Sequence, residues 1–467
     1  MDLDLQELAY KAVRYASDSG AQYCDARAET QERKSAALEN REIEHIRTSN
    51  DRGIGIRLNR GKAWGFCSVT NPESFEQIKD AIDAAMKNMA NSTGNKNKLH
   101  PNDPNKTKID FPVLKKPDLE ELIKIGIECS EIISNTPRII KSVVSPWYTN
   151  NSKYFTNSEG SEIIQNFTDV VVDMVATSHE LGSTQSVNIT EGGRGGLEQI
   201  TNIHHSAQEI ASKASQLLDA KPAKEEKATV VMNPDFVSLL THEILGHPSE
   251  ADRVLGKEMA WAGGAWWKGR IGQKIGSEEL NVFDDPTIKE SLGWYYFDDE
   301  GVKTKKTTLI ERGVLKNHMQ NRETAVTFDT HPTGNMRATN YRFMPLIRMA
   351  CTCIGKGDWK ANEIINEVKN GYFISNMKIP SIDMKRHNWS ISCQYAQKIE
   401  NGEITDLLRD VIVIGTAPEF FESIDACGDD FTIRPITNCG KGDPMQSMIM
   451  GNGGPTIRGI ATVKSVN

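Results

Sequence analysis

ATVVMNPDFVSLLTHEILGHPSEAD, from Ala228 to Asp252, is the stretch that decides how the C-terminal part of the chain should fold. Its first five residues are apolar or β-branched and predict a short buried strand. Asn233 suits the N-cap of a helix, and Pro234 suits its first position, where no backbone N–H is needed. Apolar side chains then recur at helical spacing: Phe236, Leu239, Leu240 and Ile244. We therefore expect a strand that leads directly into a helix with one apolar face.

The expected helix carries two histidines and a glutamate: His242, Glu243 and His247. Neutral imidazoles bind zinc, and an adjacent carboxylate can take a proton from metal-bound water. The spacing is HExxxH, however, and positions five apart on a regular α-helix point about 140° away from each other. The rings can meet through a π-bulge, or if the helix ends at Gly246, because Pro248 disfavours the α conformation before it. Spacing alone leaves open a second reading, two unrelated histidines near a helix end.

Length, charge and cysteine content limit the class of protein. The 467 residues suffice for two or three domains, and the polar linker DAKPAKEEK predicts two, residues 1–222 and 223–467. A net charge of −8 argues against a general nucleic-acid-binding protein, and no apolar run approaches the ~18 residues of a membrane span. The first residues, MDLDLQELAY, lack the apolar core of a signal peptide. Eight cysteines without a CxxC pair are typical of reduced thiols, so we expect a cytoplasmic protein.

The pattern of apolar residues predicts an α+β fold. Helical periodicity is found at residues 3–20, 74–89, 119–134 and 206–218. Alternating segments predict an antiparallel sheet in the N-terminal domain: 24–30, 35–39, 43–49, 53–58, 63–69, 139–150, 152–157, 161–176 and 184–190. Residues 91–116 are expected to form a solvated loop, and EGGRGG at 191–196 a flexible turn. Strands also predominate after the HExxxH helix, which makes the C-terminal domain β-rich.

HEILGHPSEADRV resembles the HExxxH signature of the TldD/PmbA family of zinc metalloproteases, which were historically labelled modulators of DNA gyrase. The resemblance extends over nearly the whole chain, through N-terminal DARAE, DRGIGIR and KAWGFCSVTN. Further segments follow in the family's order: DDEG (298–301), LIERGVLKNHMQNRETA (309–325), TGNMRA (333–338), PLIRM (345–349), SIDACGDDF (423–431) and CGKG (439–442). Because this chain keeps HExxxH, it resembles the metal-bearing TldD branch, and the expected helix is a metalloprotease helix.

The resemblance implies a function and a site. The cysteine of CGKG corresponds to the family's third zinc ligand, so zinc is expected on His242, His247 and Cys439, with Glu243 as general base. Three protein ligands leave the fourth position open, as catalytic zinc requires. The implied activity is a zinc-dependent peptidase for unfolded or leader-type peptides, bound by strand addition near Gly451–Gly454. The implied assembly is a dimer, either a homodimer or a heterodimer with a PmbA-like sibling.

Two other functions compete with the peptidase. A non-catalytic regulatory or binding protein, in the sense of the gyrase-modulator label, would need no general base, so the intact His-Glu-His set argues against it. A zinc amidohydrolase for small amides would share the same site. Glu250 and Asp252 either accept an imidazole N–H or lie on the surface as solvated acids. The chain departs from the family pattern at three positions that leave the metal ligands unchanged: Gln320, Cys351 and Cys393.

Overall fold

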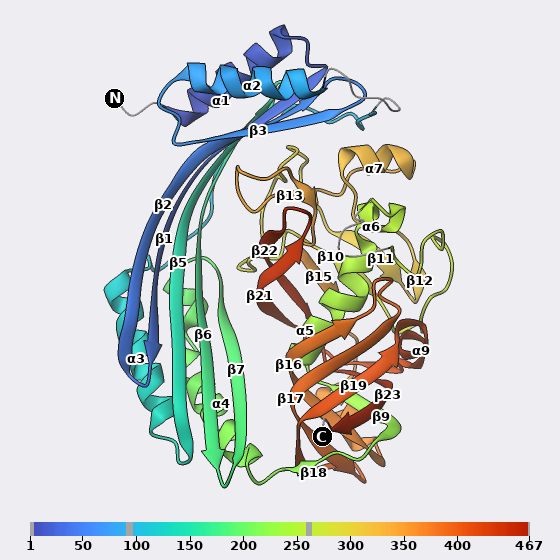
Figure 1. Ribbon diagram of the computed structural model, residues 1–467. Coiled ribbons are helices and arrows are strands. Elements are labelled where there is room, and N and C mark those ends of the chain that lie inside the picture. Colours follow the sequence, from blue (N-terminus) through green and yellow to red (C-terminus); the bar gives the residue numbers. More distant parts are fainter. Residues whose placement is uncertain (1–3, 90–96, 258–263, 466–467) are drawn as a thin grey trace.

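The computed structural model describes residues 4–89, 97–257 and 264–465. The fold is α+β, as predicted, with a long antiparallel sheet in the N-terminal part and a β-rich C-terminal part. The long sheet is strongly curved, and its concave face is turned toward the C-terminal part (Figure 1). Within the described ranges, none of the helices has the length and apolar character needed to cross a membrane.

The N-terminal part is built on a seven-stranded sheet with the order β3-β2-β1-β5-β6-β4, to which β7 adds by pairing with β6. The strands are β1 (Tyr23–Glu39), β2 (Glu42–Asn59), β3 (Trp64–Thr70), β4 (Lys106–Asp110), β5 (Ile139–Asn157), β6 (Glu162–Glu180) and β7 (Ser183–Arg194). All pairings are antiparallel except that of β4 with β6. The described part of the stretch predicted to be a loop at 91–116 therefore contains a strand, which corrects that prediction.

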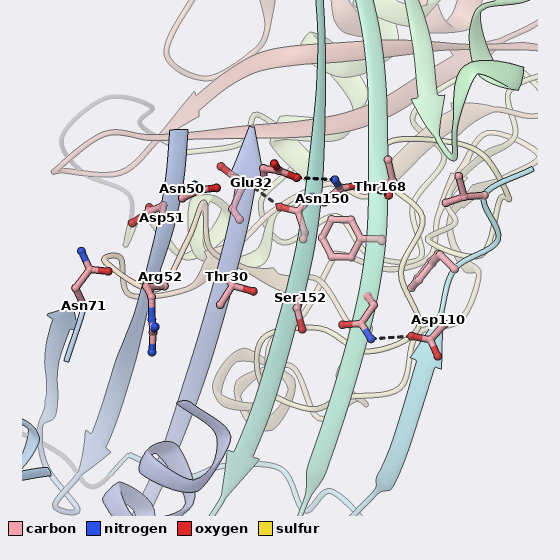
Figure 2. A pocket seen from close by; sticks show the side chains of 16 residues that line it. Thr30, Glu32, Asn50, Asp51, Arg52, Asn71, Asp110, Asn150, Ser152 and Thr168 are labelled. Carbon is pink, nitrogen blue, oxygen red and sulfur yellow. Dashed lines mark hydrogen bonds between the residues drawn. The ribbon is translucent and has the colours of Figure 1, made fainter. Parts of the chain in front are cut away.

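Two pairs of helices cover the outer face of this sheet at its two ends. They are α1 (Leu5–Asp18) with α2 (Phe75–Met89), and α3 (Leu119–Ser134) with α4 (Ile203–Leu217). On β1, Ala26 and Ala28 pack with the first pair, whereas Ala36 and Leu38 pack with the second. Between the pairs, polar side chains cross the sheet in rows, among them Thr30 beside Arg52 and Ser152 (Figure 2).

This uncovered strip explains why the strands are longer than predicted. Residues 24–30 and 35–39, predicted to be two strands, form the single strand β1, and β2 and β5 likewise each replace two predicted strands. The polar residues between each two predicted strands lie where no helix covers the sheet. Their polarity therefore reflects exposure to solvent and does not mark an interruption of the strand. The predicted flexible turn at 191–196 is also wrong, because Gly192 and Gly193 lie within β7. A β-carbon at Gly192 would lie 2.2 Å from the carbonyl oxygen of Val170.

The C-terminal part contains an eight-stranded sheet, ordered β16-β9-β23-β19-β17-β18-β8 with β20 on β23, and a six-stranded sheet, ordered β12-β11-β10-β15-β22-β21. The strands of the first are β8 (Lys221–Pro222), β9 (Glu226–Met232), β16 (Asn370–Ile382), β17 (Asn388–Glu400), β18 (Glu403–Arg409), β19 (Val411–Thr416), β20 (Ala426–Cys427) and β23 (Ile457–Ser465). Those of the second are β10 (Val282–Asp284), β11 (Thr307–Glu311), β12 (Val314–Leu315), β15 (Cys351–Ile354), β21 (Thr432–Lys441) and β22 (Gln446–Gly454). A separate pair is formed by β13 (Met336–Arg337) and β14 (Leu346–Ile347).

The helix α5 (Pro234–Thr241) lies between the two C-terminal sheets and contacts β16 of one and β22 of the other. Its apolar residues belong to the largest buried cluster of the described chain. Shorter helices complete this part: α6 (Ala251–Leu255), α7 (Arg322–Thr327), α8 (Ala361–Asn366) and α9 (Ala417–Ser423). Because β8 already pairs with β18, the segment predicted to be a linker is partly taken up in the C-terminal sheet. The domain division at residue 222 stays a prediction.

Buried ion pairs join the two parts. Arg57 of the N-terminal sheet is fully buried between Asp25, at 2.6 Å, and Glu300 of the C-terminal part, at 2.9 Å. Beside this pair, Arg27 lies 3.9 Å from Asp299. Removing one partner from such a buried pair typically costs several kcal/mol, about 3–5, because a charge is left uncompensated. Asp299 and Glu300 of the DDEG segment therefore help to hold the concave sheet against the C-terminal part.

Candidate metal centre

The strand, cap and helix predicted for Ala228 to Asp252 are confirmed, and the distortion of the helix is a π turn. The side chain of Asn233 accepts a hydrogen bond from the N–H of Phe236 at 2.9 Å, which caps α5. The helix then widens over His242–Gly246, where the N–H of His247 donates to the carbonyl oxygen of His242. An i→i+5 bond of this kind returns the fifth residue to the same side of the helix.

The alternative, a helix that ends at Gly246, is wrong. His247 keeps α-helical backbone angles, φ −56° and ψ −44°, although Pro248 follows it, and the chain continues as a 3₁₀ turn over His247–Ser249. Gly246 serves close packing, because a β-carbon there would lie 2.0 Å from Sδ of Met349. The preference against α conformation before proline is thus overridden by tertiary packing around this turn.

The structure brings His242 and His247 together with Cys439, which lies on β21. One potential ligand atom of each residue lies within 4.8 Å of the others, and all three side chains are buried. Cys439 Sγ is 3.5 Å from His247 Nε2, and the two imidazole rings are 4.7 Å apart and nearly perpendicular. Two imidazoles and one thiolate match the softness and number of ligands that a catalytic zinc ion prefers.

Hydrogen bonds on the far side of each ring set its tautomer. His242 Nδ1 lies 3.1 Å from Oδ1 of Asn452, whose amide nitrogen donates to the carbonyl oxygen of Thr352 at 3.1 Å. The amide oxygen therefore faces the ring and accepts its N–H. His247 Nδ1 lies 3.2 Å from Oε2 of Glu250, which accepts in the same way. Both rings thus carry their proton on Nδ1 and leave Nε2 as the free donor atom for a metal.

A buried cation fixes Glu250 in turn. Lys441, the lysine of CGKG, is 3.2 Å from Glu250 and 2.8 Å from Asp252, and Arg253 Nε is 2.6 Å from Glu250. Burial acts to raise the pKa of Glu250, but Lys441, Arg253 and His247 hold that pKa well below its ordinary value. Of the two acids considered from the sequence, Glu250 accepts the imidazole N–H, and Asp252 binds the lysine.

The cluster stabilises a negative thiolate. Burial acts to raise the pKa of Cys439, but His242 and His247 hold it well below its usual range. Burial also acts against a charged His242, yet the thiolate and Glu243 raise the pKa of His242 to about 9. Without a metal, a proton is thus held between the thiolate and the imidazoles. A divalent cation would replace that proton, so the electrostatics of these residues fit zinc.

Glu243 lies beside the cluster and forms an ion pair with Arg386. Burial acts to raise the pKa of Glu243, but His242, His247 and Arg386 hold it below its ordinary value, so the side chain is a carboxylate. Both side chains of the pair are partly accessible, with 13% of Glu243 and 16% of Arg386 exposed. A carboxylate in this position can accept a proton from a molecule bound at the cluster.

Arg386 belongs to the loop between β16 and β17 and has a left-handed backbone, with φ 60°. The side chain of Asp383 holds this loop by accepting hydrogen bonds from the backbone N–H groups of Lys385, at 3.0 Å, and His387, at 2.9 Å. The N–H of Trp266 donates to the carbonyl oxygen of Lys385 at 3.0 Å. Sequence reasoning missed both Arg386 and Asn452, because nothing local marks either residue: Arg386 lies in the loop between β16 and β17, and Asn452 lies within β22, far along the chain from the histidines.

The cluster opens into a cavity of about 660 Å³ between the two parts of the molecule. The concave face of β6 and β7 contributes Asp173, Asn188 and Thr190, and residues 435–440 of β21 form the opposite wall. β21 is the outer strand of its sheet. The strand addition expected at Gly451–Gly454 is excluded, because β22 is already paired with β15 on one side and β21 on the other.

Family models of PmbA/TldA metallopeptidases match three segments: domain 1 at residues 24–89, the central domain at 112–218 and the C-terminal domain at 225–459. A metalloprotease of Methanocaldococcus jannaschii is 33% identical over 448 residues, which cover 94% of this chain and 96% of the relative. A zinc metalloprotease TldD homolog of Saccharolobus solfataricus is 26% identical over 452 residues, which cover 96% of this chain and 98% of the relative.

Solved structures share the fold. TldE from Thermococcus kodakarensis superposes with a TM-score of 0.79 at 19% identity, covering 98% of this chain and 100% of that chain. A Thermotoga maritima protein described as a candidate modulator of a DNA gyrase has a TM-score of 0.82 at 18% identity, and the superposition covers 98% of this chain and 100% of that chain. The matches together define the class as a metallopeptidase. The chain belongs to the PmbA/TldD family, and it stands with the TldD homologues, as its sequence indicated.

Replacing Asn452 with alanine removes the acceptor that holds the tautomer of His242. We expect the zinc affinity to fall by about 10–100-fold, as is typical when the hydrogen-bond partner of a metal-binding histidine is lost. Competition with a chromogenic chelator measures this affinity. The control is Asn438→Ala, which removes an exposed amide beside Cys439. Equal zinc affinity of the two variants would contradict the role given to Asn452.

Proposed function

We propose that the protein is a zinc-dependent peptidase that hydrolyses peptide bonds in unfolded or leader-type peptides. The observation that carries the proposal is the convergence of His242, His247 and Cys439, within 4.8 Å of one another, beside the carboxylate of Glu243. A purely structural zinc site normally uses four protein ligands, whereas a catalytic site keeps one position open. Curated relatives named metalloproteases support the same conclusion.

Zinc held by His242, His247 and Cys439 would acidify a water molecule and polarise the carbonyl group of the peptide bond. Glu243 takes the proton that this water loses and passes it to the nitrogen of the leaving amine. The guanidinium of Arg386 lies against the same carboxylate. It can therefore offer positive charge to the carbonyl oxygen as negative charge develops there, which is the role of an oxyanion stabiliser.

The outer edge of β21, which is the last strand of its sheet among the described residues, supplies a binding surface for the peptide. Cys439 lies on this strand, and residues 435–440 line the cavity in front of the cluster. An extended peptide paired with β21 would bring one of its peptide bonds past the cluster, with backbone hydrogen bonds that do not depend on sequence. Folded proteins seldom offer a free extended segment, so an unfolded or leader-type peptide is the substrate class that this surface fits.

A dimer, formed by two copies of this chain or with a PmbA-like sibling, and a cytoplasmic location complete the proposal. All eight cysteines are free, which fits a reducing compartment. Activity should accordingly be measured for the chain alone and after mixing with a sibling subunit.

Glu243→Gln separates catalysis from metal binding. We expect it to retain zinc, because Glu243 is not among the metal-binding atoms of the cluster, and to lose peptide hydrolysis by at least about 10²–10⁴-fold, because no base remains. Zinc content by mass spectrometry and the digestion of casein measure the two properties. Glu225→Gln, which changes an exposed glutamate, is the control. A wild-type protein that binds no zinc and cuts nothing, alone or with a sibling, would instead indicate a non-catalytic regulatory protein.

Arg386→Gln tests the stabilisation of the carbonyl oxygen. We expect kcat to fall by about 10²–10³-fold with little change in zinc content, as when one oxyanion donor is removed from other hydrolases. Lys385→Gln, which alters an exposed cation on the same loop, is the matched control and should leave kcat unchanged. An increase of KM alone in the Arg386 variant would show that this arginine binds substrate without stabilising the transition state.

A further inference from the structure

A second cavity, of about 260 Å³, lies farther along the space between the two parts of the molecule. The concave face of the long sheet forms one wall, with Trp147 and Lys153, and the C-terminal part forms the other, with Arg337 and Ile449. Thr437 of β21 lines both this cavity and the one in front of the metal cluster. The two cavities therefore adjoin at β21.

A peptide paired with β21 would reach both cavities. Thr437 precedes Cys439 by two residues, which corresponds to about 7 Å along a strand. The pairing of β21 with β22 shifts register between Ile436 and Cys439. Residues a few positions from the bond that is cut would therefore lie at the second cavity, where their side chains would meet its charged lining.

The acidic residues of this lining are already paired with cations. Asp169 is 2.8 Å from Arg194, and Asp51 forms an ion pair with Arg342. The third acid of the lining, Glu29, lies 3.4 Å from Arg27 and 3.8 Å from Lys153. These carboxylates are thus paired with other cations and form no ion pair with Arg33 or Arg337, the two remaining cations of the cavity.

Arg337 is one such cation. It is buried, with 8% of its surface exposed, and donates to the carbonyl oxygens of Met349, at 2.6 Å, and Ile449, at 3.0 Å. Its guanidinium lies 4.9 Å from the centre of the Tyr295 ring. In the part of the chain that the structure describes, it forms no ion pair. Burial lowers the pKa of Arg337, and repulsion from Arg194 and Arg348 acts in the same direction, whereas Tyr295 and the more distant Asp299 act to raise it. A buried guanidinium with only carbonyl and ring contacts favours an anion beside it.

Arg33 is the other. Its guanidinium lies 4.3 Å from the centre of the Trp147 ring, and Arg33 also has no ion-pair partner among the described residues. Asp173 attracts it from a distance, but the carboxylate of Asp173 accepts a hydrogen bond from the hydroxyl of Thr190 at 2.6 Å. The side chain of Arg33 is exposed, so a molecule bound in the cavity can reach its guanidinium.

We propose that this second cavity is a subsite for an acidic side chain of the peptide substrate, whose carboxylate binds Arg33 and Arg337. The proposal rests on the proposed peptidase function and specifies its substrate class: unfolded segments that carry Asp or Glu a few residues from the bond that is cut. Arginine suits this role because its planar group donates two parallel hydrogen bonds to a carboxylate. The stack on Trp147 keeps the guanidinium of Arg33 at the edge of the cavity.

Binding to the zinc-loaded Glu243→Gln protein tests the proposal without turnover. The probes are fluorescein-labelled unstructured peptides that differ only by Glu or Gln, scanned over successive positions. We expect one or two neighbouring positions at which the Glu peptide binds about tenfold more tightly, as for a charge-assisted hydrogen bond. The preference should shrink as salt rises from 50 to roughly 500 mM, because salt screens the interaction.

Arg33→Gln in the same background should reduce the preference at that position to about twofold or less. Lys34→Gln is the matched control, since Lys34 is the neighbouring cation on the opposite, outer face of β1 and lies over Tyr148. Arg337→Lys keeps the charge but loses the paired donors, and it should also weaken the preference.

The outcomes separate the two proposals. Equal binding of Glu and Gln peptides at every position, or a full preference in Arg33→Gln, would overturn the acidic subsite and leave the peptidase proposal intact. Absence of binding by every peptide, together with no cleavage by the wild-type protein, would overturn both.

Discussion

A single backbone hydrogen bond, from the N–H of His247 to the carbonyl oxygen of His242, is the constraint on which the rest of the site depends. A regular helix would direct positions 242 and 247 about 140° apart, whereas the π turn returns both rings to one side. Packing maintains the turn: Gly246 leaves room for Met349, and α5 is held between two sheets. The HExxxH spacing and the π turn therefore depend on each other, because only together do they place both imidazole rings on one side of the helix.

The hairpin of β21 and β22 supplies the other residues of the metal centre. It carries Cys439 to the two rings, Asn452 to the far side of His242, and Lys441 beneath Glu250. The lysine of CGKG thus acts on His247 through Glu250, while the cysteine of the same motif contacts His247 directly. The same hairpin turns the outer edge of β21 toward the space beneath the curved sheet. Ligand convergence and the proposed substrate surface consequently share one structural element.

Local features could be predicted from the sequence because local interactions determine them. The cap at Asn233, the proline at the first turn and the amphipathic helices were predicted correctly. The structure differs from the prediction where tertiary context decides: the polar strip between the helix pairs belongs to continuous strands, and tertiary packing overrides the preference against α conformation before proline. Convergence of Cys439 with the histidines was implied by the family resemblance and not by spacing. Arg386 and Arg337 act through contacts with distant segments, which no local pattern reveals.

X-ray absorption at the zinc edge tests the central claim most directly, because it counts the atoms around the metal. We predict one sulfur at about 2.3 Å and two imidazole nitrogens at about 2.0–2.1 Å from the zinc, with the sulfur signal lost in Cys439→Ser. A spectrum without sulfur in the wild-type protein, or an unchanged spectrum after replacement of Cys439, would contradict it.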